Sequence, residues 1–308
     1  MTIILGSRGS QLALAQTGLT KQAFERLPER PAMVVRIIKT TGDQRLDISL
    51  SRPGPKIDQG LFTKELEEAL LRKEIDVAVH SLKDLPTALP DGLELAATLP
   101  RHDPGDVLIS KSAKSLQEVP EHGVIATSSL RRGRQILLSR PDLHIVDVRG
   151  NVPTRIAKLA GENSWNSIVL AKAGLERLGY RLDHGHIDFE SSPLFVSNLE
   201  EILPAVGQGA IGLQARSNDL ELKQLLVQVN DPKTWFCVQA ERELLRMLGG
   251  GCQLPLGVRT RLNNDDFWME AILFRDEAAP ISGFVSGVFS DPTAAAVALL
   301  DRIYEEGK

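Results

Sequence analysis

Short apolar runs alternate with amphipathic segments along most of the chain. The apolar residues 2–5 predict a strand, and Ser10 can cap a helix in which Leu12, Ala15 and Leu19 follow helical spacing. Further strands are expected at 33–38, 75–79, 107–109, 124–126, 143–148, 168–170, 211–214, 268–273 and 281–289. Further helices are expected at 62–70, from 128, from 154, twice after 220, and from 292. This rhythm favours an α/β fold with mainly parallel sheets and with ligands at the carboxyl ends of the strands.

Three polar segments interrupt this rhythm. The segment 52–60 is rich in Pro and Gly and is expected to be a loop. The segments 101–105 and 191–199 are interpreted as crossovers between structural units. At 308 residues the chain is long for one domain, so two or three units are expected.

Composition excludes several classes of protein. Hydrophobic residues make up 42% and charged residues 25%, with a net charge of −4, so neither nucleic acid nor an anionic membrane is an expected partner. Two cysteines without a C-x-x-C pair are too few for a disulfide framework. No run approaches the ~18–20 apolar residues of a membrane span, and the N-terminus does not resemble a signal peptide. We expect a reducing, cytoplasmic compartment.

Positive charge is concentrated between residues 127 and 158. Seven Arg or Lys residues stand there against two acids. Arg131 and Arg132 follow a predicted strand and open a helix, where backbone N–H groups and the hydroxyls of Ser128 and Ser129 favour an anion. Similar strand-to-helix positions are held by Arg8, Ser10, Arg149, Arg155 and Arg177. Single surface salt bridges are the alternative for each arginine, but their shared position favours one polyanion site.

Asp84 is the candidate catalytic carboxylate. It lies just past the predicted strand 75–79, beside Lys83. In a cleft of arginines it would be ionised and could stabilise a cationic intermediate, whereas burial without cations would favour acid catalysis. A plain helix N-cap is the alternative interpretation.

Cys252 follows three glycines, which leave its thiol on backbone that a bulky group could approach. It could be a buried structural cysteine, a nucleophile, or a covalent attachment point. A nucleophile needs a paired base, and none of the six histidines offers a local signature for one. Cys237 falls in an apolar helical run and is expected in the core. His184 and His186 lack further ligands, so no metal is expected.

Seven segments together resemble the porphobilinogen deaminase (hydroxymethylbilane synthase) family, in order and over essentially the whole chain. They are 7–13, 60–67, 76–86, 127–132, 143–155, 204–210 and 250–255. The resemblance implies two α/β domains of the periplasmic-binding-protein type II kind and a smaller C-terminal α+β domain. Their expected bounds are 1–99 with 200–217, 100–199, and 218–308. Gln59 stands where the family often has lysine, in a loop that would act as a lid.

The resemblance also implies a chemistry. A dipyrromethane cofactor would be joined through a thioether to Cys252, and four porphobilinogen units would be added to it with loss of ammonia. Asp84 would assist that loss and stabilise the azafulvene cation. The cofactor ligands would be Lys83, Ser128, Ser129, Arg131, Arg132 and Arg155, and the substrate residues would be Arg8, Ser10, Arg149 and Arg177. The implied partner is a small molecule, and the protein is expected to be a monomer.

Two other functions are possible from the sequence alone. A non-catalytic binding protein for a small dicarboxylate would explain the arginines but not Cys252 or a third domain. An RNA-binding protein would use the basic stretch at 127–158. Aromatic residues make up only 5% of the chain and do not interleave with the basic ones, which argues against RNA.

Overall fold

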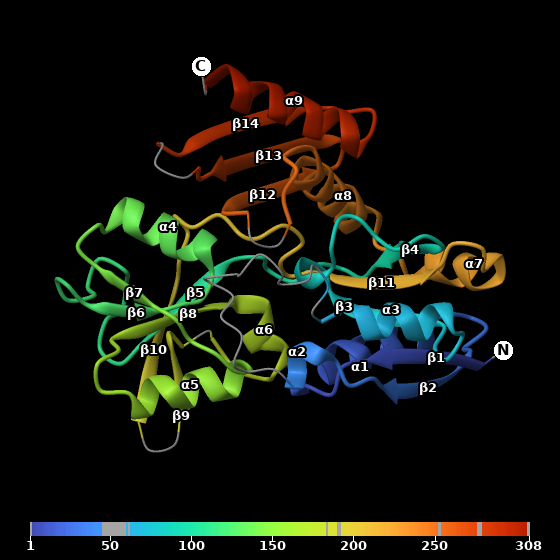
Figure 1. Ribbon diagram of the computed structural model, residues 1–308, viewed down its shortest axis with the longest axis horizontal. Coiled ribbons are helices and arrows are strands. Elements are labelled where there is room, and N and C mark those ends of the chain that lie inside the picture. The colour runs from blue at the N-terminus through green and yellow to red at the C-terminus, as the bar shows by residue number, and fades with distance from the viewer. Residues whose placement is uncertain are drawn as a thin grey trace.

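The computed structural model describes residues 2–44, 60, 62–182, 184–189, 192–251, 254–275 and 279–306. Three units, each built around its own sheet, surround a common centre (Figure 1). The prediction of an α/β protein with two larger units and a smaller C-terminal α+β unit is confirmed. None of the helices in the described ranges is long and apolar enough to cross a membrane.

The first unit contains a five-stranded sheet in the order β2-β1-β3-β11-β4. Its strands are β1 (Thr2–Ser7), β2 (Ala32–Ile37), β3 (Val77–Ser81), β4 (Leu93–Thr98) and β11 (Ile211–Arg216). Its helices are α1 (Gln11–Glu25), α2 (Thr41–Gln44), α3 (Lys64–Leu71) and the 3₁₀ helix Leu82–Asp84. Helix α7 (Leu220–Val229) also belongs to this core, because Leu222 and Leu226 are fully buried in the same cluster as Ile3 and Leu213.

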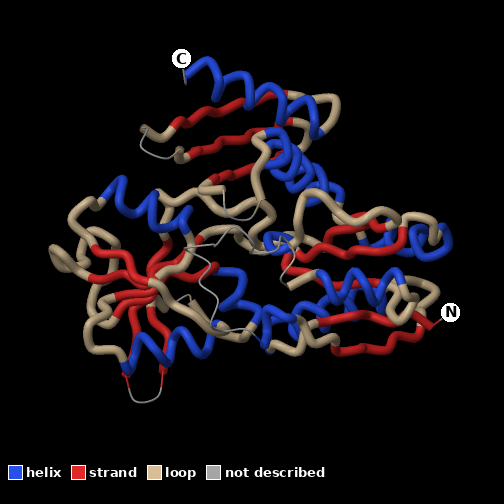
Figure 2. The backbone as a smooth tube through the Cα atoms, viewed as in Figure 1, coloured by secondary structure: helices blue, strands red, loops and turns tan. Residues whose placement is uncertain are grey.

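The second unit contains a six-stranded sheet in the order β7-β6-β8-β5-β10-β9, which fans out in Figure 2. Its strands are β5 (Asp106–Ser110), β6 (Val124–Ala126), β7 (His144–Val146), β8 (Ser167–Ala171), β9 (His186–Phe189) and β10 (Ser192–Asn198). Its helices are α4 (Leu130–Ser139), α5 (Val152–Gly161) and α6 (Lys172–Arg177).

The third unit is an antiparallel sheet covered on one face by two helices. The strands are β12 (Leu256–Asn263), β13 (Asp266–Leu273) and β14 (Ile281–Gly287), and the helices are α8 (Pro232–Met247) and α9 (Pro292–Glu306). Alternate residues of β13, such as Phe267 and Met269, are fully buried against both helices. Cys237 of α8 lies in this core, as predicted.

The prediction of mainly parallel sheets is wrong. Strand β11 runs antiparallel to both of its neighbours, and β5 and β10 do the same in the second sheet. The cause is the position of the crossovers: Ile211 pairs with Ser81 at the carboxyl end of β3, and Asp106 pairs with Ala171 at the carboxyl end of β8. A strand entered from that edge must run back through the sheet.

The interpretation of 191–199 as a crossover is also wrong, because most of it is strand β10. Leu194 and Val196 are buried on one face, while Phe195 and Ser197 alternate with them. The chain returns to the first unit through residues 199–210 instead. Strands β4, β9 and β12 were not predicted.

A fully buried carboxylate, Glu241 of α8, joins both crossovers to the third unit. It accepts hydrogen bonds from Arg101 Nη1 at 2.6 Å and Nη2 at 3.1 Å, and from the backbone N of Gly207 at 2.7 Å. Thr260 Oγ1 of β12 donates to the same carboxylate at 2.6 Å. Both crossovers are therefore held at one charged centre.

Replacing Arg101 by leucine is expected to lower the free energy of unfolding by about 3–5 kcal/mol, because it leaves the Glu241 charge buried and unpaired. Urea denaturation of the purified protein measures this. Arg246→Leu is the matched control, since Arg246 pairs with Glu243 on the exposed side of the same helix. Equal stabilities of the two variants would contradict the central role of Glu241.

Candidate functional site

A cavity of about 530 Å³ lies where the three units meet. The first unit contributes residues 82–87, and the second contributes Arg155 and the start of α4. The third contributes residues around Gly250 and Arg242, and the return crossover supplies Gln208. The predicted residues among its lining are Lys83, Asp84, Ser128, Ser129, Arg131, Arg132 and Arg155. Site residues predicted from distant parts of the sequence therefore line one cavity.

Asp84 and Lys83 reach the cavity from the 3₁₀ helix that follows β3. Leu82 anchors this turn, since its side chain is buried and its backbone N donates to Ala210 O at 3.1 Å. Asp84 is the last residue of the short helix, so the alternative interpretation as a helix N-cap is wrong. Burial lowers the pKa of Lys83 to about 8, and the charge of Asp84 opposes this shift.

The start of α4 presents two buried guanidinium groups. Ser129 caps the helix and accepts a hydrogen bond from the backbone N of Arg132 at 3.4 Å, so the helix starts at Leu130, two residues later than the predicted start at 128. Arg131 and Arg132 are each 5% exposed. Ser128 donates to Val148 O at 2.8 Å, so its hydroxyl also joins this turn to the segment that follows β7.

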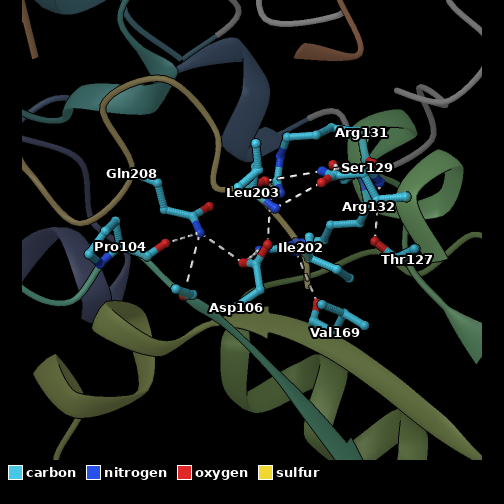
Figure 3. Close-up of polar contacts among 12 residues, drawn as sticks. Pro104, Asp106, Thr127, Ser129, Arg131, Arg132, Val169, Ile202, Leu203 and Gln208 are labelled. Atoms are coloured by element: carbon cyan, nitrogen blue, oxygen red, sulfur yellow. Dashed lines mark hydrogen bonds and ion pairs between the residues drawn. The ribbon is translucent and has the colours of Figure 1, made fainter. Parts of the chain in front are cut away.

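Asp106, the first residue of β5, lies between these two arginines, and each of its carboxylate oxygens accepts a hydrogen bond from one of them (Figure 3). Arg131 Nη2 donates to one of its oxygens at 2.8 Å and Arg132 Nη2 to the other at 2.7 Å. Burial alone would raise the pKa of Asp106, but the two guanidinium charges outweigh it and hold that pKa well below its usual range. Asp106 therefore remains a carboxylate.

The turn before α5 places Arg155 in the same wall. Gly150 has a φ of +113°, and a Cβ there would lie 2.7 Å from the Thr154 side chain, so only glycine fits. Arg155 Nε donates to Gly150 O at 2.8 Å. Burial lowers the pKa of Arg155 to about 10, and the charges of Arg132 and Arg149 add to this. Arg149 lies near enough to act on Arg155 but does not line the cavity.

A smaller chamber of about 70 Å³ adjoins the cavity, and Asp84 and Phe62 line both. Arg8 and Ser10 line the chamber. The Arg8 guanidinium lies over the Phe62 ring, 4.2 Å from its centroid. Ser10 is the N-cap of α1, as predicted, and accepts from the backbone N of Ala13.

Arg177 lies outside both hollows. Its Nη2 donates to Gly209 O at 2.6 Å, and burial lowers its pKa to about 10. It therefore joins α6 to the return crossover. Its predicted role in binding substrate stays a prediction.

The third unit closes the cavity with Gly250 and Gly251. A Cβ on Gly250 would lie 2.5 Å from Leu254, so the backbone packs closely there. Cys252, the predicted attachment point, lies outside the described residues, as do Gln59 and the rest of the predicted lid up to that position. Within the described ranges, no three His, Cys, Asp or Glu side chains cluster as metal ligands.

Sequence reasoning missed three polar residues that line or support this site: Asp106, Gln208 and Arg242. Arg242 of α8 lines the cavity, and it donates to Leu85 O at 2.9 Å and to Pro86 O at 2.7 Å, next to Asp84. Its signal is weak, because it sits in an ordinary amphipathic helix. Asp106 could have been suspected as a lone acid opening an apolar strand.

Comparison with known proteins identifies the family. The model of "Porphobilinogen deaminase, dipyromethane cofactor binding domain" matches residues 3–224, and that of "Porphobilinogen deaminase, C-terminal domain" matches residues 235–294. The chain belongs to the porphobilinogen deaminase family. A porphobilinogen deaminase of Desulforudis audaxviator is 44% identical over 308 residues, covering 99% of this chain and 95% of the relative. One of Bacillus mycoides is 42% identical over 309 residues, with coverages of 99% and 95%.

A similarity to solved structures is weaker. The periplasmic VFT2 domain of Bordetella pertussis BvgS aligns with a TM-score of 0.44 and 12% identity, over 74% of this chain and 86% of that one. This similarity is too low to support any argument about the porphobilinogen deaminase family member described here.

The cavity fits the dipyrromethane cofactor that the matched porphobilinogen deaminase domain binds. Every ring of such a cofactor carries an acetate and a propionate, and the wall offers the side-chain cations Lys83, Arg131, Arg132 and Arg155. The Nε atoms of Arg131 and Arg132 are buried and have no hydrogen-bond partner. Buried polar groups are normally satisfied, so an acceptor such as a carboxylate is expected there.

The binding of acidic ligands by this porphobilinogen deaminase family member is expected to weaken as pH rises through 8. Lys83 is an ammonium below its pKa of about 8 and neutral above it, so its charge falls roughly ten-fold between pH 7 and pH 9. The affinity of the protein without cofactor for hydroxymethylbilane should fall by up to about that factor. Lys83→Arg, which stays charged, should abolish this fall. An affinity that changes equally with pH in both proteins would contradict the assignment to Lys83.

Proposed function

We propose that this protein is a porphobilinogen deaminase, a transferase that joins four porphobilinogen molecules head to tail into hydroxymethylbilane. One ammonia would leave for each unit added. The observation that carries the proposal is a cavity where Asp84 stands among cations of the second unit while the glycines before Cys252 close it from the third unit. That combination suits a polyanionic chain attached at one end.

The cofactor would be held by charge. Arg131, Arg132 and Arg155 would bind its carboxylates, with Lys83, Ser128 and Ser129 beside them, and Cys252 would carry the thioether. When bound, the dipyrromethane supplies the pyrrole α-carbon to which the first substrate is joined. Guanidinium groups suit this task because they bind carboxylates in a bidentate manner.

Asp84 would act on the incoming substrate. The amine of its aminomethyl group is protonated at neutral pH, so when the C–N bond breaks neutral ammonia leaves with the bonding electrons, and the positive charge passes to the substrate's pyrrole ring. A fixed carboxylate beside that ring stabilises the charge as it forms and accepts a hydrogen bond from the ring N–H. Asp84 lines both hollows, which supports placing the reacting bond at their junction.

The smaller chamber would bind the carboxylates of the incoming substrate. Arg8 and Ser10 lie on its wall, and stacking on Phe62 restricts the Arg8 guanidinium. A side chain held in place loses less entropy on binding and orients the substrate better. Arg149 and Arg177 would bind the chain as it lengthens.

The domain bounds are part of the proposal. We infer a monomeric cytoplasmic enzyme with the predicted domains at 1–99 with 200–217, at 100–199, and at 218–308, with one change. The packing of α7 on the first core supports moving residues 218–229 from the third domain to the first.

Incubation with porphobilinogen tests the proposed function. We expect ammonia and hydroxymethylbilane in a ratio of four to one, and an intact mass increased by two linked pyrrole units. Peptide mapping should locate that mass at Cys252. Reversible binding of porphobilinogen without ammonia release or added mass would identify a binding protein instead.

A further inference from the structure

Asp106 is a buried carboxylate that three side chains share. Besides Arg131 and Arg132, Gln208 donates to it through Nε2 at 2.8 Å (Figure 3). The Asp106 side chain is fully buried. It faces the cavity lining from behind, since both arginines and Gln208 line the cavity and Asp106 does not.

The two guanidinium groups are fixed by acceptors on two sides. Arg131 Nη1 donates to Leu203 O, and Arg132 Nη1 donates to Val169 O at 3.0 Å. With Asp106 on Nη2, each group is held by two contacts, and each keeps a buried Nε–H without a partner. One carboxylate against two guanidinium groups also leaves a net positive charge for a bound anion.

Gln208 connects this cluster to the third unit. Its side chain also donates to Pro104 O at 2.6 Å, and its backbone O accepts from Arg101 Nε at 2.8 Å. Arg101 in turn binds Glu241 of α8. A continuous set of contacts therefore runs from the arginine pair to the unit that contributes Gly250 and Gly251 to the same cavity.

We propose that Asp106 is a positioning residue of this site. It orients Arg131 and Arg132 toward the carboxylates of the cofactor. Through Gln208 it also fixes the position of both guanidinium groups relative to the third unit. A guanidinium displaced by about 1 Å can cost two orders of magnitude in rate. This inference rests on the proposed function, because the ligand it serves is the cofactor.

The rate of cofactor loading tests the proposal. Apoprotein, prepared from cells that make no porphobilinogen, is mixed with hydroxymethylbilane, and the fraction carrying the adduct is followed by intact mass. Asp106→Asn removes a negative charge beside the site, so attraction of the anionic ligand alone would speed loading. Loss of position predicts loading slowed by about ten-fold or more. Asp142→Asn, which breaks an Arg140 pair away from the cavity, should load at the wild-type rate.

A slower rate in folded Asp106→Asn supports the proposal, and an equal or faster rate overturns it, whatever happens to the melting temperature. If Asp106→Asn does not fold, Gln208→Ala tests the proposal instead. This variant keeps the contacts of Asp106 with both arginines and removes only the side-chain hydrogen bonds of Gln208. Loading of Gln208→Ala slowed by about three-fold supports the proposal. If Gln208→Ala instead loads as fast as the exposed control Gln228→Ala, the proposal is overturned. Wild-type protein that never loads overturns the proposed function and this inference together.

Discussion

Replacing Cys252 by alanine is expected to give a folded protein that carries no covalent pyrrole and makes no hydroxymethylbilane. The sulfur is the only part of this residue that the proposed thioether needs. Substrate could still enter the cavity, since its cations remain, but the growing chain would have no anchor. We expect turnover to fall below detection, which intact mass and product absorbance both measure.

Cys237→Ala is the control for this prediction. Cys237 is 7% exposed in the core of the third unit, and burial raises the pKa of its thiol to about 11. Because the thiolate is the reactive form, this sulfur is protected from attachment. The variant should keep the adduct. An adduct that persists in Cys252→Ala and disappears in Cys237→Ala would show that Cys237 is the attachment point and that the assignment to Cys252 is wrong.

Asp84→Asn is expected to reduce turnover by about 10²–10⁴-fold while leaving the cofactor attached. Asparagine keeps the size of the side chain and removes the charge that would face the cation left by ammonia. The cations that would hold the cofactor, such as Arg155 and Lys83, are unchanged. Single-turnover ammonia release measures the effect on chemistry, and intact mass measures the retained cofactor.

The exposed Asp91 provides the control for Asp84. Asp91→Asn makes the same chemical change in the same unit without touching either hollow and should leave turnover unchanged. A fully active Asp84→Asn would remove Asp84 from the mechanism. Loss of the cofactor in Asp84→Asn would instead give the carboxylate a role in attachment.

Local signals in the sequence predicted the parts of the fold that depend on residues close together in the sequence. Ser10 caps α1 through the backbone N of Ala13, and Ser129 caps α4 through that of Arg132. Each contact spans three residues, so a short window contains it. Arg131, Arg132 and Arg155 meet at one cavity because β6 and β7 are parallel, so the turns that follow them lie at the same edge of the sheet.

The direction of β11 and the partner of Asp106 depend on residues far away. Asp106 binds Arg131, 25 residues on, and Gln208, 102 residues on. Nothing in the segment around Asp106 distinguishes these partners from other polar residues. Strand direction fails in the same way, because it depends on the edge at which a crossover enters the sheet and not on the strand's own pattern.

The order of strands in the first sheet has a consequence for synthesis on the ribosome. Strand β11 lies between β3 and β4, so β4 has no partner in that sheet until residues 211–216 have been made. The second sheet is continuous in sequence, from Asp106 to Asn198. Because chains emerge from their N-terminus, the middle unit is expected to finish folding first. The N-terminal unit must wait, with an unpaired strand edge, for more than half of the chain that follows it.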